Sequence, residues 1–136
     1  MPNINEMQYV NMWLKEFHPN ALIYPRMRVG QSNSLTGAER LWPDKIFIED
    51  GVVNILEAKI KPVSSGIGQL LGYNMLFPKT PEFFFAKEYP RKMVLLTALH
   101  NETIEAMAKE HNIEYVVYRP PMIEEELARR TRAGEE

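Results

Sequence analysis

The chain has 136 residues, no cysteine, and 16 Lys and Arg against 18 Asp and Glu, which gives a formal net charge of −2. This length predicts a single domain, residues 1–136, and the lack of cysteine excludes disulfides and cysteine-ligated zinc or iron–sulfur centres. No apolar run approaches the ~18 residues of a membrane span and the N-terminus lacks the apolar core of a signal peptide, so we expect an intracellular, cytoplasmic protein without membrane contact.

The small net charge hides an uneven distribution of charged residues. Residues 1–92 hold eleven Lys and Arg against nine Asp and Glu, whereas residues 93–136 hold five against nine. Phosphates are bound by a local basic surface and not by the overall charge of a protein. The first part of the chain is therefore compatible with nucleic-acid binding.

Helical and strand patterns alternate along the chain. We expect a helix at 5–17, capped by Asn3 or Asn5, a strand at 21–29, and a polar loop at 31–40. This order of elements predicts an α/β fold with a mixed central sheet flanked by helices. A hairpin at 44–60 follows, then a helix that Ser64-Ser65-Gly66 caps and that runs to about Phe77, and an irregular connection with three prolines at 78–91. The last elements are an apolar strand at 93–97, a helix that Asn101 caps and that runs to about His111, a strand at 113–118, and a helix opened by Pro120-Pro121.

The segment PDKIFIEDGVVNILEAK, residues 43–59, contains a strong turn signal. Asp50-Gly51 between apolar runs predicts a type I′ hairpin turn, because that turn needs positive φ at both central positions. In the resulting register Asp44 faces Glu57, and a slip of one residue would separate them. Because side chains alternate along a strand, one face carries Asp44, Ile46, Ile48, Val53, Ile55, Glu57 and Lys59, and the other carries Phe47, Leu56, Ala58 and Ile60.

Both faces of this hairpin are apolar, which is typical of strands that are covered by helices on both sides. Charges on a covered sheet are costly unless they have a partner or a role. Two carboxylates as close as Asp44 and Glu57 repel each other unless a cation lies between them. The pattern therefore favours a site for a divalent cation, with Lys59 next in the row, over an ordinary hairpin with scattered surface charges.

Two helices offer further polar side chains to this row. Glu6 falls near the middle of the apolar face of the first helix, so it is a candidate third acidic ligand or water-positioning group; interaction with the helix dipole is the alternative. Gln69 and Tyr73 are four residues apart on the helix after the hairpin and lie one above the other. The apolar face of that helix is expected to consist of Ile67, Leu70, Leu71, Met75 and Phe77.

Four basic residues are candidates for contacting nucleic acid. Arg26 and Arg28 alternate on the predicted first strand, and an arginine binds phosphate through two parallel hydrogen bonds. A solvated strand edge explains this pair equally well. Lys61 extends the basic row of the hairpin, and Arg40 ends the polar loop at 31–40, which can wrap around nucleic acid.

The hairpin motif has a counterpart in a known family. Pro43-Asp44, followed after a strand, a turn and a strand by Glu57-Ala58-Lys59, resembles the signature of the PD-(D/E)XK nuclease superfamily. The resemblance implies a Mg²⁺-dependent deoxyribonuclease, in which Mn²⁺ substitutes for Mg²⁺ and which hydrolyses phosphodiester bonds in DNA. Asp44, Glu57 and the Ala58 carbonyl are then the metal ligands, and Lys59 positions or activates the attacking water.

The following helix supports the same family. Gln69 and Tyr73, in the stretch QLLGY, are similar to the Gln-x-x-x-Tyr element of its RecB-like branch, where they would orient a phosphate or a water. The stretch from Arg26 through the polar loop to the hairpin also resembles archaeal-type Holliday-junction resolvases. The resemblance covers residues 5–97 and implies a restriction-endonuclease-like αβββαβ core, which leaves residues 100–136 as an additional C-terminal helix–strand–helix.

The sequence leaves the type of nuclease undecided between an exonuclease, an endonuclease and a junction-resolving enzyme. Junction resolution requires two active sites and therefore a homodimer. Two other interpretations stay open. The chain can be a non-cleaving nucleic-acid-binding module or partner subunit on the same fold, or a different α/β protein in which the charged row is a structural ion-pair network.

Overall fold

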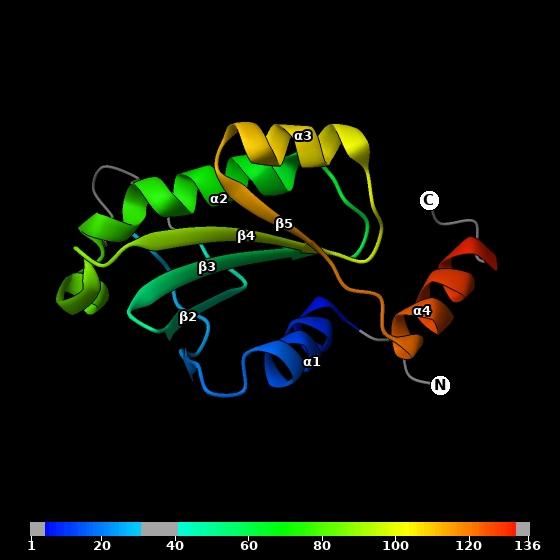
Figure 1. The fold of residues 1–136 in the computed structure, drawn as a ribbon, viewed down its shortest axis with the longest axis horizontal. Coiled ribbons are helices and arrows are strands. Elements are labelled where there is room, and N and C mark those ends of the chain that lie inside the picture. The colour runs from blue at the N-terminus through cyan, green and yellow to red at the C-terminus, as the bar shows by residue number, and fades with distance from the viewer. Residues whose placement is uncertain (1–4, 31–40, 133–136) are drawn as a thin grey trace.

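A five-stranded mixed sheet with helices on both faces forms the body of the molecule (Figure 1). The computed structural model describes residues 5–30 and 41–132. The elements are α1 (Glu6–Phe17), β1 (Leu22–Ile23), β2 (Lys45–Glu49), β3 (Val52–Lys59), α2 (Ser65–Leu76), the 3-10 helices η1 (Phe77–Lys79) and η2 (Pro81–Ala86), β4 (Arg91–Thr97), α3 (Glu102–Glu110), β5 (Ile113–Val117) and α4 (Pro121–Arg132).

The strands lie in the order β1-β2-β3-β4-β5. β2 pairs antiparallel with both β1 and β3, whereas β3, β4 and β5 are parallel. The predicted αβββαβ core is therefore present, and α3, β5 and α4 follow it as the additional C-terminal part. Within the described part of the chain, no helix is both long enough and apolar enough to cross a membrane.

The turn between β2 and β3 has the predicted geometry. Asp50 and Gly51 have φ values of 52° and 74°, as a type I′ turn requires. The ladder that grows from this turn pairs Glu49 with Val52 and continues to Lys45 with Leu56, which is the predicted register. This register fixes which side chains of the hairpin share a face.

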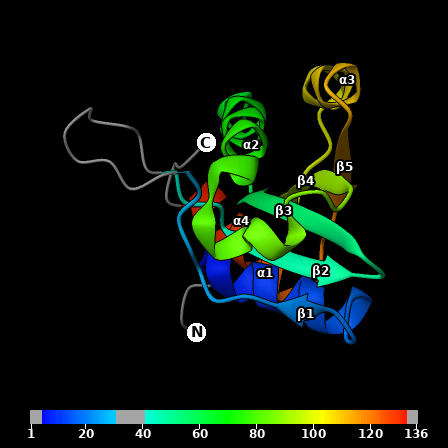
Figure 2. The ribbon, with the colours of Figure 1, turned by 90° about the vertical axis from the view of Figure 1, so that its left-hand side faces the viewer.

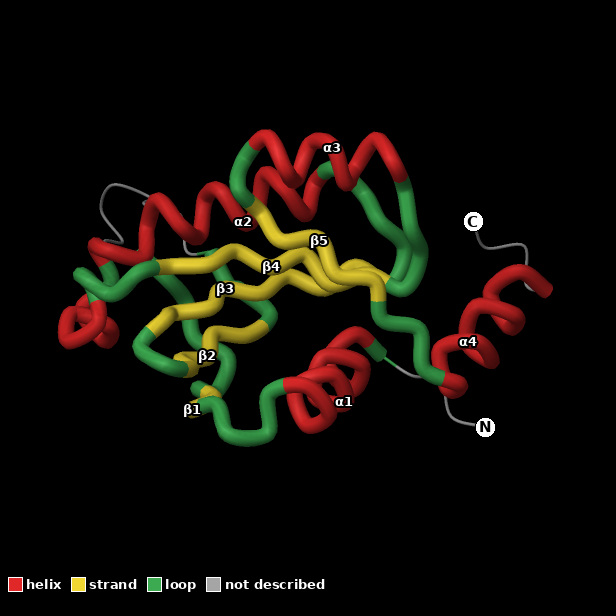
Figure 3. The backbone as a smooth tube through the Cα atoms, in the orientation of Figure 1, coloured by secondary structure: helices red, strands yellow, loops and turns green. Residues whose placement is uncertain are grey.

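Two helical layers cover the sheet, as Figure 2 shows from the side and Figure 3 shows in the orientation of Figure 1. Helices α2 and α3 pack on the face that carries Ile46 and Ile55. Helix α1 packs on the opposite face, which carries Phe47 and Leu56, and Ile123 of α4 joins the same apolar cluster beside α1. Both faces are buried, which is why apolar residues lie on both faces of the hairpin. The central strand β3 is covered along most of its length.

Helix α1 begins with reciprocal capping. The Asn5 side chain accepts a hydrogen bond from the Gln8 backbone at 2.8 Å, and the Gln8 side chain accepts one from the Asn5 backbone at 2.9 Å. Asn5 is thus the cap, whereas Asn3 lies outside the described residues. Farther along the helix, the Tyr9 hydroxyl donates to the Tyr118 carbonyl at 2.7 Å and ties α1 to the segment after β5.

The predicted strand at 21–29 is wrong in length, because only Leu22–Ile23 forms a strand. Tyr24 still donates its backbone N–H to Ile46, but the next residue is Pro25, which has no N–H to extend a ladder. The chain leaves the sheet there and forms an isolated bridge between Val29 and Leu41. The predicted polar loop at 31–40 lies outside the described residues.

Two further predictions after the hairpin are wrong. Met75 was expected in the apolar face of α2, but it is 67% exposed, whereas Tyr73 is buried in the core. The Ser64 side chain makes no capping hydrogen bond at the start of α2. The connection predicted as irregular at 78–91 contains the two 3-10 helices, each with a proline in its first turn.

A substitution in the hairpin turn tests the register. Gly51→Ala is expected to lower the free energy of unfolding by about 1–2 kcal/mol, because an L side chain is disfavoured at positive φ. Gly68→Ala is the matched control: it lies in α2, a Cβ there meets no atom within 4 Å, and alanine should stabilise the helix by about 0.5–1 kcal/mol. Urea denaturation measures both, and wild-type stability of Gly51→Ala would contradict the type I′ turn.

Candidate active site

The two predicted acidic residues meet at the open end of the hairpin. Asp44 comes directly before β2, and its Oδ2 accepts a hydrogen bond from the Ala58 backbone N–H at 2.8 Å. Glu57 lies in the last part of β3, which is opposite Asp44 when the ladder is continued by one residue. The two side chains interact electrostatically, since the charge of Asp44 raises the pKa of Glu57.

Glu57 is held in place by two neighbours. Its side chain is 5% exposed, its Oε1 accepts a hydrogen bond from the Tyr73 hydroxyl at 2.8 Å, and its Oε2 lies 3.4 Å from Lys59 Nζ. The Tyr73 hydroxyl also lies 3.2 Å from the Trp42 carbonyl oxygen, a second acceptor. The residues of the hairpin and of α2 therefore converge, as predicted, around a buried carboxylate.

The environment of Glu57 disfavours its charge. Burial raises the pKa of Glu57 to about 7, the charge of Asp44 adds to this rise, and the hydrogen bond from Tyr73 and the ammonium group of Lys59 oppose it. Burial also raises the pKa of Tyr73, and Glu57 adds to that rise. Tyr73 consequently keeps its proton and serves as a hydrogen-bond donor.

The Ala58 carbonyl faces the same corner. Val53 donates its N–H to the Pro90 carbonyl next to β4, so Ala58, five residues on, directs its backbone groups toward β2, in agreement with its bond to Asp44. The residue that continues the β2 ladder opposite Ala58 is Pro43, which has no N–H to donate. The ladder therefore ends before this carbonyl, which leaves its oxygen without a ladder hydrogen bond from β2.

Lys59 extends the row as predicted. Its side chain is 23% exposed, and its Nζ lies beside Glu57. The first turn of α2 approaches its stem closely, because a Cβ at Gly66 would lie 3.5 Å from Lys59 Cγ and 2.9 Å from Leu95 Cδ1. Glycine at this position thus lets α2 pack directly over the site.

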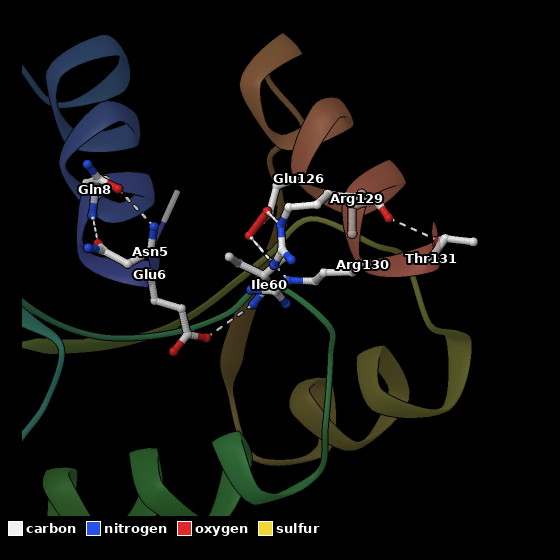
Figure 4. A network of polar contacts seen from close by, with 9 residues as sticks. Asn5, Glu6, Gln8, Ile60, Glu126, Arg129, Arg130 and Thr131 are labelled. Carbon is white, nitrogen blue, oxygen red and sulfur yellow. Dashed lines mark hydrogen bonds and ion pairs between the residues drawn. The ribbon is translucent and has the colours of Figure 1, made fainter. Parts of the chain in front are cut away.

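Glu6 is close to the end of β3 without joining the two carboxylates. It is the first residue of α1, and its Oε2 accepts a hydrogen bond from the Ile60 backbone N–H at 3.3 Å (Figure 4). Among residues 5–30 and 41–132, no group of three or more His, Cys, Asp or Glu side chains converges closely enough to hold a metal ion. Glu6, the candidate third acidic ligand, therefore binds a backbone amide and does not join Asp44 and Glu57 in a three-carboxylate cluster.

Gln69 lies one turn before Tyr73 on α2. Its Oε1 is buried and has no hydrogen-bond partner among the described residues. A buried amide oxygen without a partner is costly, so this atom is available to a water or to a bound group. Its position on the same helix as Tyr73 agrees with the predicted pairing of the two residues.

The four predicted basic residues have different surroundings. Arg26 and Arg28 do not alternate on a strand, because the chain leaves the sheet before them. The guanidinium carbon of Arg26 lies 5.9 Å from the centroid of the Trp42 ring. Arg28 Nε is buried without a partner in the described part of the chain, Lys61 is half-buried after β3, and Arg40 lies outside the described residues.

Trp42 is the residue of this site that the sequence patterns did not single out. Its carbonyl contacts Tyr73, its ring contacts Arg26, and 45% of its surface is exposed. The sequence feature that could have indicated Trp42 is side-chain alternation, because the period of two that places Asp44 and Ile46 on one face places residue 42 there as well.

The sheet order, the two helical layers and the position of the carboxylates define a restriction-endonuclease-like fold. The chain is similar to EndoMS in a complex with double-stranded DNA, with a TM-score of 0.59 and 13% identity over 89% of this chain and 47% of that chain. It is also similar to EndoMS in its apo form, with a TM-score of 0.53 and 14% identity over 89% and 49%. The chain thus spans about half the length of these structures. No protein-family model and no curated protein sequence matches it.

The raised pKa of Glu57 makes stability depend on pH. The folded protein binds a proton at Glu57 more tightly than the unfolded chain, so this contribution is complete below about pH 4.5 and is lost as the pH rises toward 7. When the pH is raised from 5 to 8 in metal-free buffer, the free energy of unfolding of the wild type should therefore fall by on the order of 2 kcal/mol more than that of Glu57→Gln.

Urea denaturation at both pH values measures this difference. Glu114→Gln is the control, because Glu114 is 46% exposed and its ion pair with Lys92 at 2.9 Å lies on the surface. Its stability should follow that of the wild type at both pH values. Equal pH dependence of Glu57→Gln and the wild type would contradict the buried, proton-binding state of Glu57.

Proposed function

We propose that the chain is a metal-dependent deoxyribonuclease of the PD-(D/E)XK type, with its active site at the open end of the β2–β3 hairpin. The main support is the convergence of Asp44, Glu57 and Lys59, together with the Ala58 carbonyl, at one corner of a restriction-endonuclease-like fold. The similarity to EndoMS bound to double-stranded DNA supports a role on DNA.

The donor set fits Mg²⁺. This ion prefers six oxygen ligands, keeps several waters, and is held by one or two carboxylates. Asp44, Glu57 and the Ala58 carbonyl would hold it. A divalent cation there would offset the repulsion that raises the pKa of Glu57 and would favour the ionised carboxylate. When bound, it would make a water easier to deprotonate and withdraw charge from the phosphate; Mn²⁺ would substitute for it.

Lys59 would act on the phosphate and on the attacking water. Its ammonium group is fixed beside Glu57 by the 3.4 Å contact and by the close packing of α2 on its stem. From there it can donate to a phosphate oxygen and stabilise the negative charge that develops on it during hydrolysis. It can also orient a water through a second N–H, because an ammonium group has three donors.

Tyr73 and Gln69 would have separate roles. Tyr73 donates to Glu57, so it is a positioning residue that orients a metal-binding carboxylate. Gln69, whose buried Oε1 has no partner among the described residues, would orient a water or, through its amide group, a phosphate. Glu6 of α1 accepts a hydrogen bond from the Ile60 amide. It would position a water near Lys59 only if its side chain gave up that hydrogen bond.

Arg26, Arg28, Lys61 and Arg40 would contact DNA phosphates. Their contribution would be sensitive to salt, because binding of phosphates releases counterions. A junction-resolving enzyme would need a homodimer, whereas an endonuclease on duplex DNA or an exonuclease would not. A non-cleaving DNA-binding module on the same fold is the second candidate, because a similarity at 13% identity shows the fold alone.

Removal of one carboxylate tests the proposal. Asp44→Asn should fold, as judged by its melting temperature, and should lose at least about 1,000-fold in cleavage rate, because a ligand of the metal is lost. Supercoiled plasmid, linear duplex, single strand and four-way junction, each with Mg²⁺, Mn²⁺ or EDTA, are the substrates. Glu49→Gln is the control, since Glu49 lies at the far end of the adjoining strand β2 and contacts His18 at 2.8 Å.

Cleavage by wild type should require the metal ion and should fall steeply with salt. Metal-independent cleavage that persists in purified Asp44→Asn would refute the nuclease assignment. Binding of DNA without cleavage of any substrate, by wild type in either metal, would show a non-cleaving module. Light scattering of the active species would decide between a monomer and a homodimer.

Tyr73→Phe tests the positioning role. The substitution removes the hydroxyl that contacts Glu57 and the Trp42 carbonyl, and leaves the buried ring. The Mg²⁺ concentration for half-maximal cleavage should rise about 10-fold, because groups that orient metal ligands typically contribute this much to metal affinity. Saturating Mg²⁺ should restore most of the rate, and an unchanged Mg²⁺ requirement would exclude this role for Tyr73.

A further inference from the structure

An exposed tryptophan with a cation over its ring lies two residues before Asp44. Trp42 is 45% exposed, and the guanidinium carbon of Arg26 lies 5.9 Å from its ring centroid, within the range of a cation–π interaction. A tryptophan in water forgoes the large apolar area that its burial would remove from solvent. Neither the core nor the sheet explains why this ring is at the surface.

The backbone of Trp42 is fixed to the site. Its carbonyl lies 3.2 Å from the hydroxyl of Tyr73, the residue that contacts Glu57. The preceding residue, Leu41, accepts the Val29 N–H at 2.8 Å and packs against α2, where a Cβ at Gly72 would lie 2.8 Å from Leu41 Cδ1. The backbone that carries the ring is therefore attached to both Tyr73 and α2.

Arg26 belongs to the same rim. Burial, Glu57 and Asp44 raise the pKa of Tyr73, and the positive charge of Arg26 acts against them, which indicates that the guanidinium is close enough to the hydroxyl to influence it. Arg26 itself is exposed. An aromatic ring and a cation thus lie together near Tyr73, the residue that contacts Glu57.

This combination is suited to a nucleobase. Aromatic rings bind bases of single-stranded DNA by stacking, each base has a π face, and an arginine adds a cation–π contact and a phosphate contact. Bases inside a continuous duplex are already stacked on their neighbours, so only an unpaired base can reach such a ring. Resting on the proposed function, we propose that Trp42 and Arg26 form a stacking platform for an unpaired nucleobase of the DNA strand held at the active site.

A second exposed aromatic residue provides an internal comparison. Phe84 is 52% exposed, and Lys87 Nζ lies 5.5 Å from its ring centroid. Phe84 belongs to η2, which leads into the first residues of β4, at the end of the sheet where β3 begins. It has the same local chemistry as Trp42 without the carboxylates, so it is the matched control.

Fluorescence separates binding from catalysis. The chain has two tryptophans, and Trp13 is 5% exposed, so base stacking should change the emission of Trp42. In EDTA, titration with an oligothymidylate of about 12 nucleotides should quench the wild type. The quenching should be absent in Trp42→Phe, and an abasic strand of the same length and charge should not quench the wild type.

Affinities measured by anisotropy with a labelled oligothymidylate complete the test. Trp42→Ala should bind about 5- to 150-fold more weakly, Trp42→Phe within about threefold of wild type, and Phe84→Ala like wild type. Equal affinity of wild type for thymidylate and abasic strands, or quenching that persists in Trp42→Phe, would overturn the platform. Neither result depends on Trp42→Ala being folded.

The outcome for the platform is independent of the outcome for the nuclease. Cleavage of DNA by wild type together with equal binding of thymidylate and abasic strands would refute the platform and leave the nuclease. Base-dependent quenching without cleavage in Mg²⁺ or Mn²⁺ would support the platform and refute the nuclease.

Discussion

The two-residue turn at one end of the β2–β3 hairpin decides what meets at the other end. Positive φ at Asp50 and Gly51 fixes a register that places Asp44 opposite Glu57. Side chains alternate with a period of two, so a slip of one residue in this register would send one of the carboxylates to the opposite face of the sheet. The helices that cover both faces bury this register and make a slip costly. Local turn chemistry and global packing therefore specify the same arrangement of charges.

The position of Glu57 carries an energetic conflict. Burial and the charge of Asp44 disfavour its ionised form, and one hydrogen bond and one ammonium group only partly compensate. The low polarity that makes the charge costly also strengthens its attraction to a cation. An ionised carboxylate in such surroundings lowers the stability of the folded protein, and a bound divalent cation would restore that free energy. Pro43 has no N–H, so it ends the ladder and donates no hydrogen bond to the Ala58 carbonyl.

Much of the sheet and part of the site could be predicted from the sequence, because turn chemistry and period-two alternation act locally. The register and the two buried faces follow from them, and the start of α3 follows from the capping side chain of Asn101. The strand at 21–29 was overestimated, because its apolar pattern did not weigh the missing N–H of Pro25. Met75 was assigned to the core in place of Tyr73, because the apolar periodicity counts apolar residues only. A tyrosine can be buried as well when its hydroxyl has a hydrogen-bond acceptor. Trp42 escaped notice for a related reason: its importance lies in an exposed ring and in Arg26, which is distant in the sequence.

The phenol of Tyr73 has one hydrogen and two acceptors, the Glu57 carboxylate and the Trp42 carbonyl. While Glu57 is charged, it is the stronger acceptor and accepts the hydrogen bond from the Tyr73 hydroxyl. Once Glu57 is neutral, its own acidic hydrogen can be donated to the phenol oxygen, and the phenol turns toward the carbonyl. The ionisation of Glu57 thus changes the hydrogen bonding of the Trp42 carbonyl before β2, because Tyr73 lies between the two and donates to one or the other.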